Sequence, residues 1–236
     1  MSATSKTSSP QTLDARPCRA VVFDFDGTLA RLNIDFVVMR SDVLKLTAQY
    51  GLAVEAVCDL PALELIDRAR ATLAAVDPPR AEAYVAAAHA RIMEIELAAA
   101  RVGELFGGTR KLLVALQKRG IGTAIITRNC LRAVRTVFPD LDQFVDTAIS
   151  REMTPRVKPH PDHLRTALAA LAAPPDGTLM VGDHPLDMQV GREVGAFTVG
   201  VLTGSGNCDD LTRAGAQCVL ASASDLLDLL DQACPP

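Results

Sequence analysis

The sequence has few aromatic side chains: its 236 residues include no tryptophan, two tyrosines and seven phenylalanines. Aliphatic residues and alanine must therefore fill the interior of any fold that it adopts. Hydrophobic residues make up 49% of the chain, which is enough for one large domain or for a main domain with a smaller companion.

Long apolar runs are absent as well. The longest alanine-rich stretch, residues 86–100, contains His89, Arg91, Glu94 and Glu96, so it cannot span a bilayer. Residues 1–17 lack the apolar segment of a secretory signal and are expected to form a disordered leader. These features predict a cytoplasmic protein with no membrane partner.

Neither sign of charge dominates, and the cysteines form no recognisable framework. The net charge of −4 and the pI near 5.6 argue against a nucleic-acid partner. The six cysteines are scattered without a CxxC spacing, which predicts reduced structural thiols rather than a zinc site or disulfides. Cys130 follows a candidate phosphate-binding loop, so a reactive thiol there is an alternative to a packing role.

Most of the chain alternates between short apolar runs and helical segments. Strands are predicted at residues 19–23, 122–126, 144–149, 178–181, 197–201 and, more weakly, 217–220. Helices are predicted between and after them at residues 109–119, 130–138, 161–172, 185–194 and 225–230. Such alternation predicts an α/β fold with a Rossmann-like parallel sheet that carries helices on both faces.

Residues 32–101 interrupt this alternation with an all-helical segment. Tyr84, Ala88 and Ile92 recur every four residues and belong to one apolar helical face. We therefore predict a small helical cap at residues 32–101, inserted after the first strand. The core would consist of residues 18–31 and 102–236.

Polar side chains directly follow three of the predicted strands, at residues 24–28, 127–129 and 182–187. In open parallel sheets, ligands bind beyond the carboxyl ends of the strands. These segments should therefore meet at one edge of the sheet, and that edge is where we expect an active site.

Two pairs of carboxylates belong to these segments. Asp24 and Asp26 could act as a nucleophile and a proton carrier, although an acidic turn is the simpler interpretation of two aspartates alone. Asp183 and Asp187, one helical turn apart, are hard oxygen donors suited to Mg²⁺, although Asp183 could instead cap a helix. Four carboxylates at one edge would repel each other without a cation, which favours a magnesium site.

Several residues could hold an anion beside these carboxylates. Gly27 permits a sharp turn whose backbone N–H groups can face a phosphate. Thr127 offers a hydroxyl at a strand end, and Lys158 offers a cation between prolines, although a threonine or lysine alone is more often structural or solvated. The candidate phosphate-binding residues are Gly27, Thr28, Thr127, Arg128, Asn129 and Lys158.

The order of these motifs resembles that of the haloacid dehalogenase superfamily, over nearly the whole folded chain. The first motif is similar to Asp24-Phe-Asp26-Gly27-Thr28-Leu29, and the second to Thr127. The third is similar to Lys158-Pro159, and the fourth to Gly182-Asp183-x-x-x-Asp187. The trailing Gly191 and Gly195 resemble the phosphoglycolate-phosphatase-like branch.

The resemblance implies a role for each matched residue. Asp24 would be the nucleophile that forms an aspartyl-phosphate, and Asp26 would protonate the leaving alcohol and then deprotonate water. Mg²⁺ would be held by the Asp24 side chain, the Asp26 carbonyl oxygen and the Asp183 side chain, with Asp187 assisting. Thr127 and Lys158 would hold the phosphoryl oxygens and complete the catalytic set.

The resemblance further implies that the helical insert is a mobile cap. Arg31, Asn33, Asp35 and Arg40 are candidates by position for contacts with the substrate. The phosphoglycolate-like branch often has an acidic residue and a serine where this chain has Arg31-Leu32. The expected substrate is therefore a small phosphorylated metabolite of the phosphoglycolate or sugar phosphate type. The protein is expected to be a monomer or a homodimer.

Other activities of the superfamily fit the residues less well. Dehalogenases lack the second acid of the first motif, which is Asp26 here. Phosphonate cleavage uses a cap lysine, and Lys45, well down the first cap helix, is the only one in the insert. A phosphomutase on the same core and an idle relative that binds a phosphorylated ligand stay open as alternatives.

The histidines near these motifs are expected to have ordinary structural roles. His160 and His163 flank a predicted helix start close to Lys158. His184 follows Asp183 and could reach metal or substrate, but a capping or surface role is the expected one.

Overall fold

The computed structural model describes residues 18–233 except residue 56. The predicted leader, residues 1–17, lies outside the described residues. Within the described part, residues 18–31 and 104–233 belong to one compact unit and residues 32–103 to a second.

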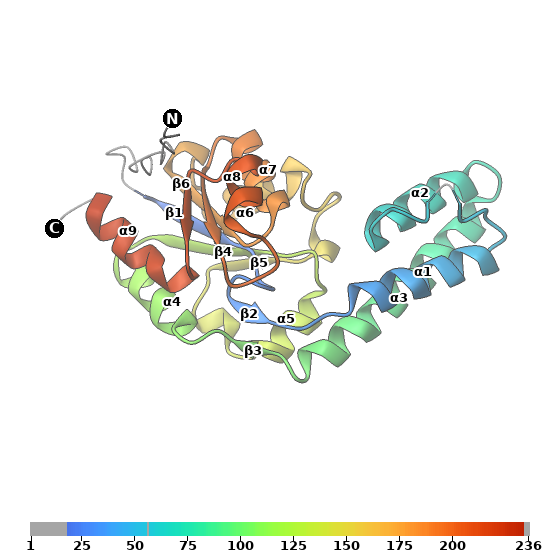
Figure 1. Cartoon of the computed structure of the whole chain (residues 1–236), viewed down its shortest axis with the longest axis horizontal. Helices are drawn as coiled ribbons and strands as arrows, with labels where there is room; N and C mark the ends of the chain where they lie inside the picture. Colours follow the sequence, from blue (N-terminus) through green and yellow to red (C-terminus); the bar gives the residue numbers. More distant parts are fainter. Residues whose placement is uncertain (1–17, 56, 234–236) are drawn as a thin grey trace, which may run out of the picture. The chain divides into compact units, whose positions relative to one another are not determined.

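The first unit is built on a parallel sheet (Figure 1). Among the described residues it has six strands in the order β5-β4-β1-β6-β7-β8. The strands are β1 Ala20–Phe23, β4 Gly122–Ile126, β5 Thr147–Ile149, β6 Thr178–Gly182, β7 Phe197–Val201 and β8 Cys218–Leu220. The chain fills β4 and β5 on one side of β1 and then β6 to β8 on the other. The predicted α/β class with a Rossmann-like sheet is confirmed.

Helices cover both faces of this sheet. The strands alternate, so Val22 packs into a buried cluster with Leu164 and Val190 from the helices α6 and α7, while Val21 and Phe23 face the other side. On the first face α7 also contacts α8, and on the second α4 contacts α9. The helices are α4 Thr109–Lys118, α5 Leu131–Val137, α6 Pro161–Leu171, α7 Pro185–Val194, α8 Cys208–Ala214 and α9 Leu226–Ala233.

Two details of this unit differ from the sequence prediction. The strand predicted at residues 144–149 is shorter, because the Asp146 carboxylate accepts the Thr123 N–H at 2.7 Å and pairing with β4 begins only at Thr147. The helix α8 was not predicted at all. Its N-cap Asn207 accepts the Asp210 N–H at 2.9 Å, which stabilises a seven-residue helix too short for its periodicity to be seen.

A short ribbon marks where the chain leaves the first unit and returns to it. Strands β2 (Ala30–Arg31) and β3 (Glu104–Leu105) pair in antiparallel fashion. The Leu29 carbonyl beside them accepts the Phe106 N–H at 2.9 Å. The remaining short turns of this unit are 3-10 helices at Leu141–Gln143, Arg151–Met153, Pro175–Gly177 and Ala223–Asp225.

The second unit consists of helices α1 (Phe36–Gln49), α2 (Ala62–Ala74) and α3 (Pro78–Ala100), which pack on one another. Asp35 and Asp77 cap α1 and α3, each accepting a backbone N–H from the first turn. Tyr84 of α3 is fully buried, and its hydroxyl lies 2.8 Å from that of Thr47 in α1. Within the described residues, no helix of either unit is long and apolar enough to cross a membrane.

Candidate functional site

The candidate site lies at the carboxyl edge of the sheet. Asp24 directly follows β1, Thr127 follows β4 and Asp183 follows β6. These three strands are neighbours in the sheet, with β1 in the middle. The strand order reverses beside β1, so the segments converge where open α/β sheets bind their ligands.

Lys158 joins two of the carboxylates. Its Nζ lies 2.7 Å from Oδ1 of Asp24 and 2.6 Å from Oδ1 of Asp187, and its side chain is buried. Burial alone would lower the pKa of Lys158, but the charges of Asp187 and Asp24 outweigh it and raise that pKa. The lysine is therefore a charged ammonium paired with carboxylates in a low-dielectric environment.

Burial raises the pKa values of both Asp187 and Asp183. Burial raises the pKa of Asp187, the charges of Asp24 and Asp183 add to this, and Lys158 acts in the opposite sense. Burial, followed by the charge of Asp24, raises the pKa of Asp183 to about 6. A bound cation would lower these pKa values, because it would stabilise the charged form of each carboxylate.

Two loops hold the Asp183 carboxylate in place. Oδ1 accepts a hydrogen bond from Thr28 Oγ1 at 3.2 Å, and Oδ2 accepts one from the Ser205 N–H at 2.9 Å. Thr203 Oγ1 donates to the Gly27 carbonyl at 2.6 Å, so the loop at residues 203–206 is tied to the first motif as well.

Glycines allow these loops to approach Asp183 closely. A Cβ atom at Gly27 would lie 2.5 Å from Oδ2 of Asp183, and Gly27 also has a φ of +85°. A Cβ at Gly204 would overlap the same carboxylate oxygen. The Asp183 carboxylate thus leaves no room for a side chain at position 27 or position 204.

Three carboxylates could bind a metal ion together. Asp24, Asp183 and Asp187 each offer an oxygen atom, and these atoms all lie within 4.8 Å of one another. Hard oxygen donors at this spacing suit Mg²⁺. Among the described residues this cluster does not include the side chain of Asp26, which is half-buried two residues beyond Asp24.

Thr127 opens the loop that was predicted to bind phosphate. Its N–H donates to the Ile149 carbonyl at 3.1 Å, and its Oγ1 accepts the Asn129 N–H at 3.1 Å. The Arg128 carbonyl accepts a hydrogen bond from Arg151 Nη1 at 3.0 Å. The loop is therefore fixed by its own hydrogen bonds and by residues at the end of β5.

Cys130 and His184 both cap helices. Cys130 is fully buried, and its Sγ accepts the Ala133 N–H at 3.4 Å at the start of α5. His184 is the N-cap of α7: its Nδ1 accepts the Leu186 N–H, and its own N–H donates to Asp187. This capping arrangement also orients the Asp187 carboxylate beside Lys158.

Sequence reasoning missed two features of this edge. The loop at residues 203–206 could have been found, because it also follows a strand, β7, at its carboxyl end. His163, which flanks the predicted start of α6, is fully buried beside Lys158. A lone histidine carries no periodic signal, so its burial could not be predicted.

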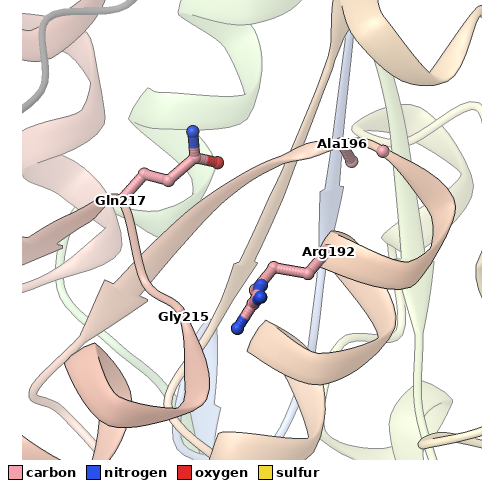
Figure 2. Close-up of a pocket in the computed structure, with 5 residues that line it drawn as sticks. Arg192, Ala196, Gly215 and Gln217 are labelled. Atoms are coloured by element: carbon pink, nitrogen blue, oxygen red, sulfur yellow. The ribbon is translucent and has the colours of Figure 1, made fainter.

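A cavity of about 380 Å³ lies elsewhere, at the amino edge of the sheet (Figure 2). Gly195 and Ala196 in its wall precede β7, and Gly215 and Gln217 precede β8, so the cavity opens at the edge opposite to the carboxylates. Arg192 is in the last turn of α7, where a cation offsets the helix carbonyls. The cavity is lined by Arg192, Gly195, Ala196, Gly215 and Gln217.

Comparisons with known proteins agree with the motifs at the carboxyl edge. The pyrophosphatase PpaX of Anoxybacillus flavithermus is 28% identical over 214 residues, which is 89% of this chain and 95% of that protein. The N-acetylmuramic acid 6-phosphate phosphatase of Pseudomonas aeruginosa is 27% identical over 224 residues, 91% of this chain and 96% of that protein.

Solved structures share the fold. A putative haloacid dehalogenase-like hydrolase from Bacteroides fragilis superposes with a TM-score of 0.65 at 22% identity, covering 88% of this chain and 99% of that one. Residues 21–201 match the family described as haloacid dehalogenase-like hydrolase. The matched range contains all four motifs, and we conclude that the chain belongs to the haloacid dehalogenase-like hydrolase family.

Proposed function

We propose that this protein is a magnesium-dependent phosphomonoester hydrolase that acts through an aspartyl-phosphate on Asp24. The observation that carries the proposal is the buried Lys158 ammonium held between Asp24 and Asp187, with Asp183 beside them. A cation and a metal-binding carboxylate set next to one potential nucleophile are what phosphoryl transfer requires, because that reaction depends on positioning and charge neutralisation.

Asp24 and Asp26 would divide the chemistry between them. An Asp24 carboxylate oxygen attacks phosphorus and the ester P–O bond breaks, while Asp26 gives a proton to the leaving oxygen. Water then attacks the phosphoryl group on Asp24, and Asp26 takes the proton of that water. Inorganic phosphate leaves, and both carboxyl groups return to their starting state.

The other residues would hold the phosphoryl group. Lys158 already lies 2.7 Å from Asp24, so a phosphoryl group on that carboxylate would meet the ammonium directly. The Thr127 hydroxyl, the Arg128 backbone N–H and the Asn129 side chain would supply donors at the end of β4. Asp24, Asp183 and Asp187 would bind Mg²⁺, whose positive charge would offset that of the phosphoryl oxygens.

We expect the substrate to be a small phosphorylated metabolite. The two relatives described above carry the names of a pyrophosphatase and a sugar 6-phosphate phosphatase. Pyrophosphate and sugar phosphates therefore join phosphoglycolate in the set of compounds that should be tested first.

The test is phosphate release from these compounds with Mg²⁺ and with a chelator. Asp24→Asn should abolish release because the amide oxygen is a poor nucleophile, whereas Asp209→Asn, at an exposed position of α8, should leave it intact. Release that persists in purified Asp24→Asn protein would refute the assigned nucleophile. No release from any compound by the wild-type protein would favour a mutase or a phosphate-binding protein instead.

A further inference from the structure

His163 lies in the first turn of α6 and is fully buried. Its Nδ1 accepts the backbone N–H of Lys158 at 3.2 Å, and its Nε2 lies 2.9 Å from the Ile149 carbonyl oxygen. A carbonyl can only accept a hydrogen bond, so the ring proton belongs on Nε2. Both ring nitrogens thus have a backbone partner, and one tautomer alone satisfies them.

The ring is neutral in this arrangement. A proton on Nδ1 would face the Lys158 N–H, which is itself a donor. Burial, followed by the charge of Lys158, lowers the pKa of His163 to about 4. The hydrogen bond to Ile149 and the charge of Asp24 act in the opposite sense without outweighing them, and the charge of Arg128 adds a smaller lowering effect. A neutral imidazole can therefore sit beside the buried ammonium without repelling it.

The Ile149 carbonyl gives the ring a fixed anchor. It accepts the Thr127 N–H at 3.1 Å as well as facing His163 Nε2, so the ends of β4 and β5 meet at this oxygen. From that anchor the opposite side of the ring reaches the backbone of Lys158. One side chain therefore connects the rigid sheet to the residue whose ammonium bridges Asp24 and Asp187.

We propose that His163 is a positioning residue for Lys158: its neutral ring, anchored on the Ile149 carbonyl, fixes the Lys158 backbone so that the ammonium meets the phosphoryl group at Asp24. This inference rests on the function proposed above. In this proposal His163 contacts neither the carboxylates nor the reacting atoms. It affects turnover only by positioning Lys158.

Three substitutions separate the two hydrogen bonds of the ring. His163→Phe fills the space but removes both. His163→Asn places an oxygen where Nδ1 lies and keeps the hydrogen bond to the Lys158 N–H. His163→Gln instead reaches toward the Ile149 carbonyl and loses the hydrogen bond to the Lys158 N–H. We expect His163→Phe and His163→Gln to lower kcat with p-nitrophenyl phosphate by up to about 100-fold, since displacement of a catalytic group by about 1 Å has such effects. His163→Asn should retain most of the activity.

A double-mutant cycle distinguishes positioning from a general loss of structure. Lys158→Met removes the ammonium, so His163→Phe should have little further effect on the Kd for inorganic phosphate in that background, although it weakens phosphate binding when Lys158 is present. Calorimetry in the presence of Mg²⁺ measures the Kd for inorganic phosphate of the wild type, the two single variants and the double variant. An equal loss in both backgrounds, or a glutamine variant more active than the asparagine variant, would overturn the proposal.

¹⁵N NMR spectra of the imidazole nitrogens report the tautomer of His163 without any measurement of activity. The chain has four histidines, so the His163 signals in ¹⁵N-histidine-labelled protein are assigned by their loss in His163→Asn. We expect the neutral ring with the proton on Nε2; a proton on Nδ1 at neutral pH would overturn the proposal. A wild-type protein that binds phosphate but hydrolyses no ester would refute the proposed function alone, and one that binds no phosphate would refute both.

Discussion

Single residues at the carboxyl edge are held in an electrostatic balance. Lys158 is buried, which disfavours its charge, yet it lies between Asp24 and Asp187, which restore it. A buried ion pair is costly to form, and breaking one by removing a partner costs about 3–5 kcal/mol because the other charge is left uncompensated. These buried ion pairs are therefore weak evidence for a stabilising role of Lys158.

The proposed role of Asp26 as a proton donor can be tested by changing the leaving group. Asp26→Asn should lower kcat/KM for alkyl phosphates by about 10²–10⁴-fold, since an alkoxide must be protonated as it leaves. The loss should be much smaller for p-nitrophenyl phosphate, whose leaving phenolate needs no proton. Steady-state kinetics with both esters measures the difference. Equal losses for the two would contradict a general acid at Asp26.

His163 makes stability depend on pH. The folded protein holds its pKa near 4, below the value of 6.5 for an exposed histidine, so the unfolded chain binds the proton more tightly. The protein should therefore lose up to about 3 kcal/mol of stability as pH falls from 6.5 towards 4 through this group alone. Urea unfolding of wild type and His163→Asn at neutral and acidic pH measures this.

The difference in stability between wild type and His163→Asn should shrink as pH falls. The free energy of unfolding of His163→Asn should be closest to that of wild type at acidic pH, because the variant has no group at this position that must lose a proton on folding. A difference between the two proteins that is constant across this pH range would contradict a buried neutral imidazole.

At the scale of elements, the loop after β7 belongs to the site as much as the loop after β1 does. Ser205 donates to Asp183, and Thr203 donates to the Gly27 carbonyl. The loop thus connects the carboxyl ends of β1, β6 and β7. Outer contacts of this kind orient a metal-binding carboxylate without touching the metal.

Gly204→Ala tests that connection. Its Cβ would overlap the Asp183 carboxylate, so the carboxylate or the loop must move. We expect the Kd for Mg²⁺ to rise by about 10- to 100-fold, the usual cost of disturbing groups around a metal ligand. Gly107→Ala is the matched control, because a Cβ there meets nothing within 4 Å. An unchanged Kd in Gly204→Ala, measured by calorimetry, would show that Asp183 is not constrained by this loop.

At the scale of the whole molecule, all the candidate metal ligands lie in the unit built from residues 18–31 and 104–233. Mg²⁺ at about 100 times its Kd should stabilise the protein by about 2.7 kcal/mol. Hydrogen exchange should show the added protection around residues 24–28, 182–187 and 203–206, with less in α1, α2 and α3. Protection confined to those three helices would place the metal elsewhere.

Much of the fold could be predicted from the sequence because it is encoded locally. Buried parallel strands such as β1, with four apolar residues in succession, and helices bounded by proline and glycine, such as α7, leave patterns within a few residues. Asp24, Thr127 and Asp183 could be placed at one edge by the same argument, since each follows such a strand. Their catalytic roles stay predictions.

Which side chains meet at this edge depends on how the whole chain packs. Lys158 and Asp24 are 134 residues apart, and no local pattern specifies that their side chains pair. The burial of His163 and the approach of Gly204 to Asp183 likewise depend on how separate loops pack. Local periodicity was enough to predict the alternation of strands and helices and the polar ends of the strands, because periodicity reports local burial. The contacts among those ends join distant segments of the chain, so they follow only from the packing of the sheet.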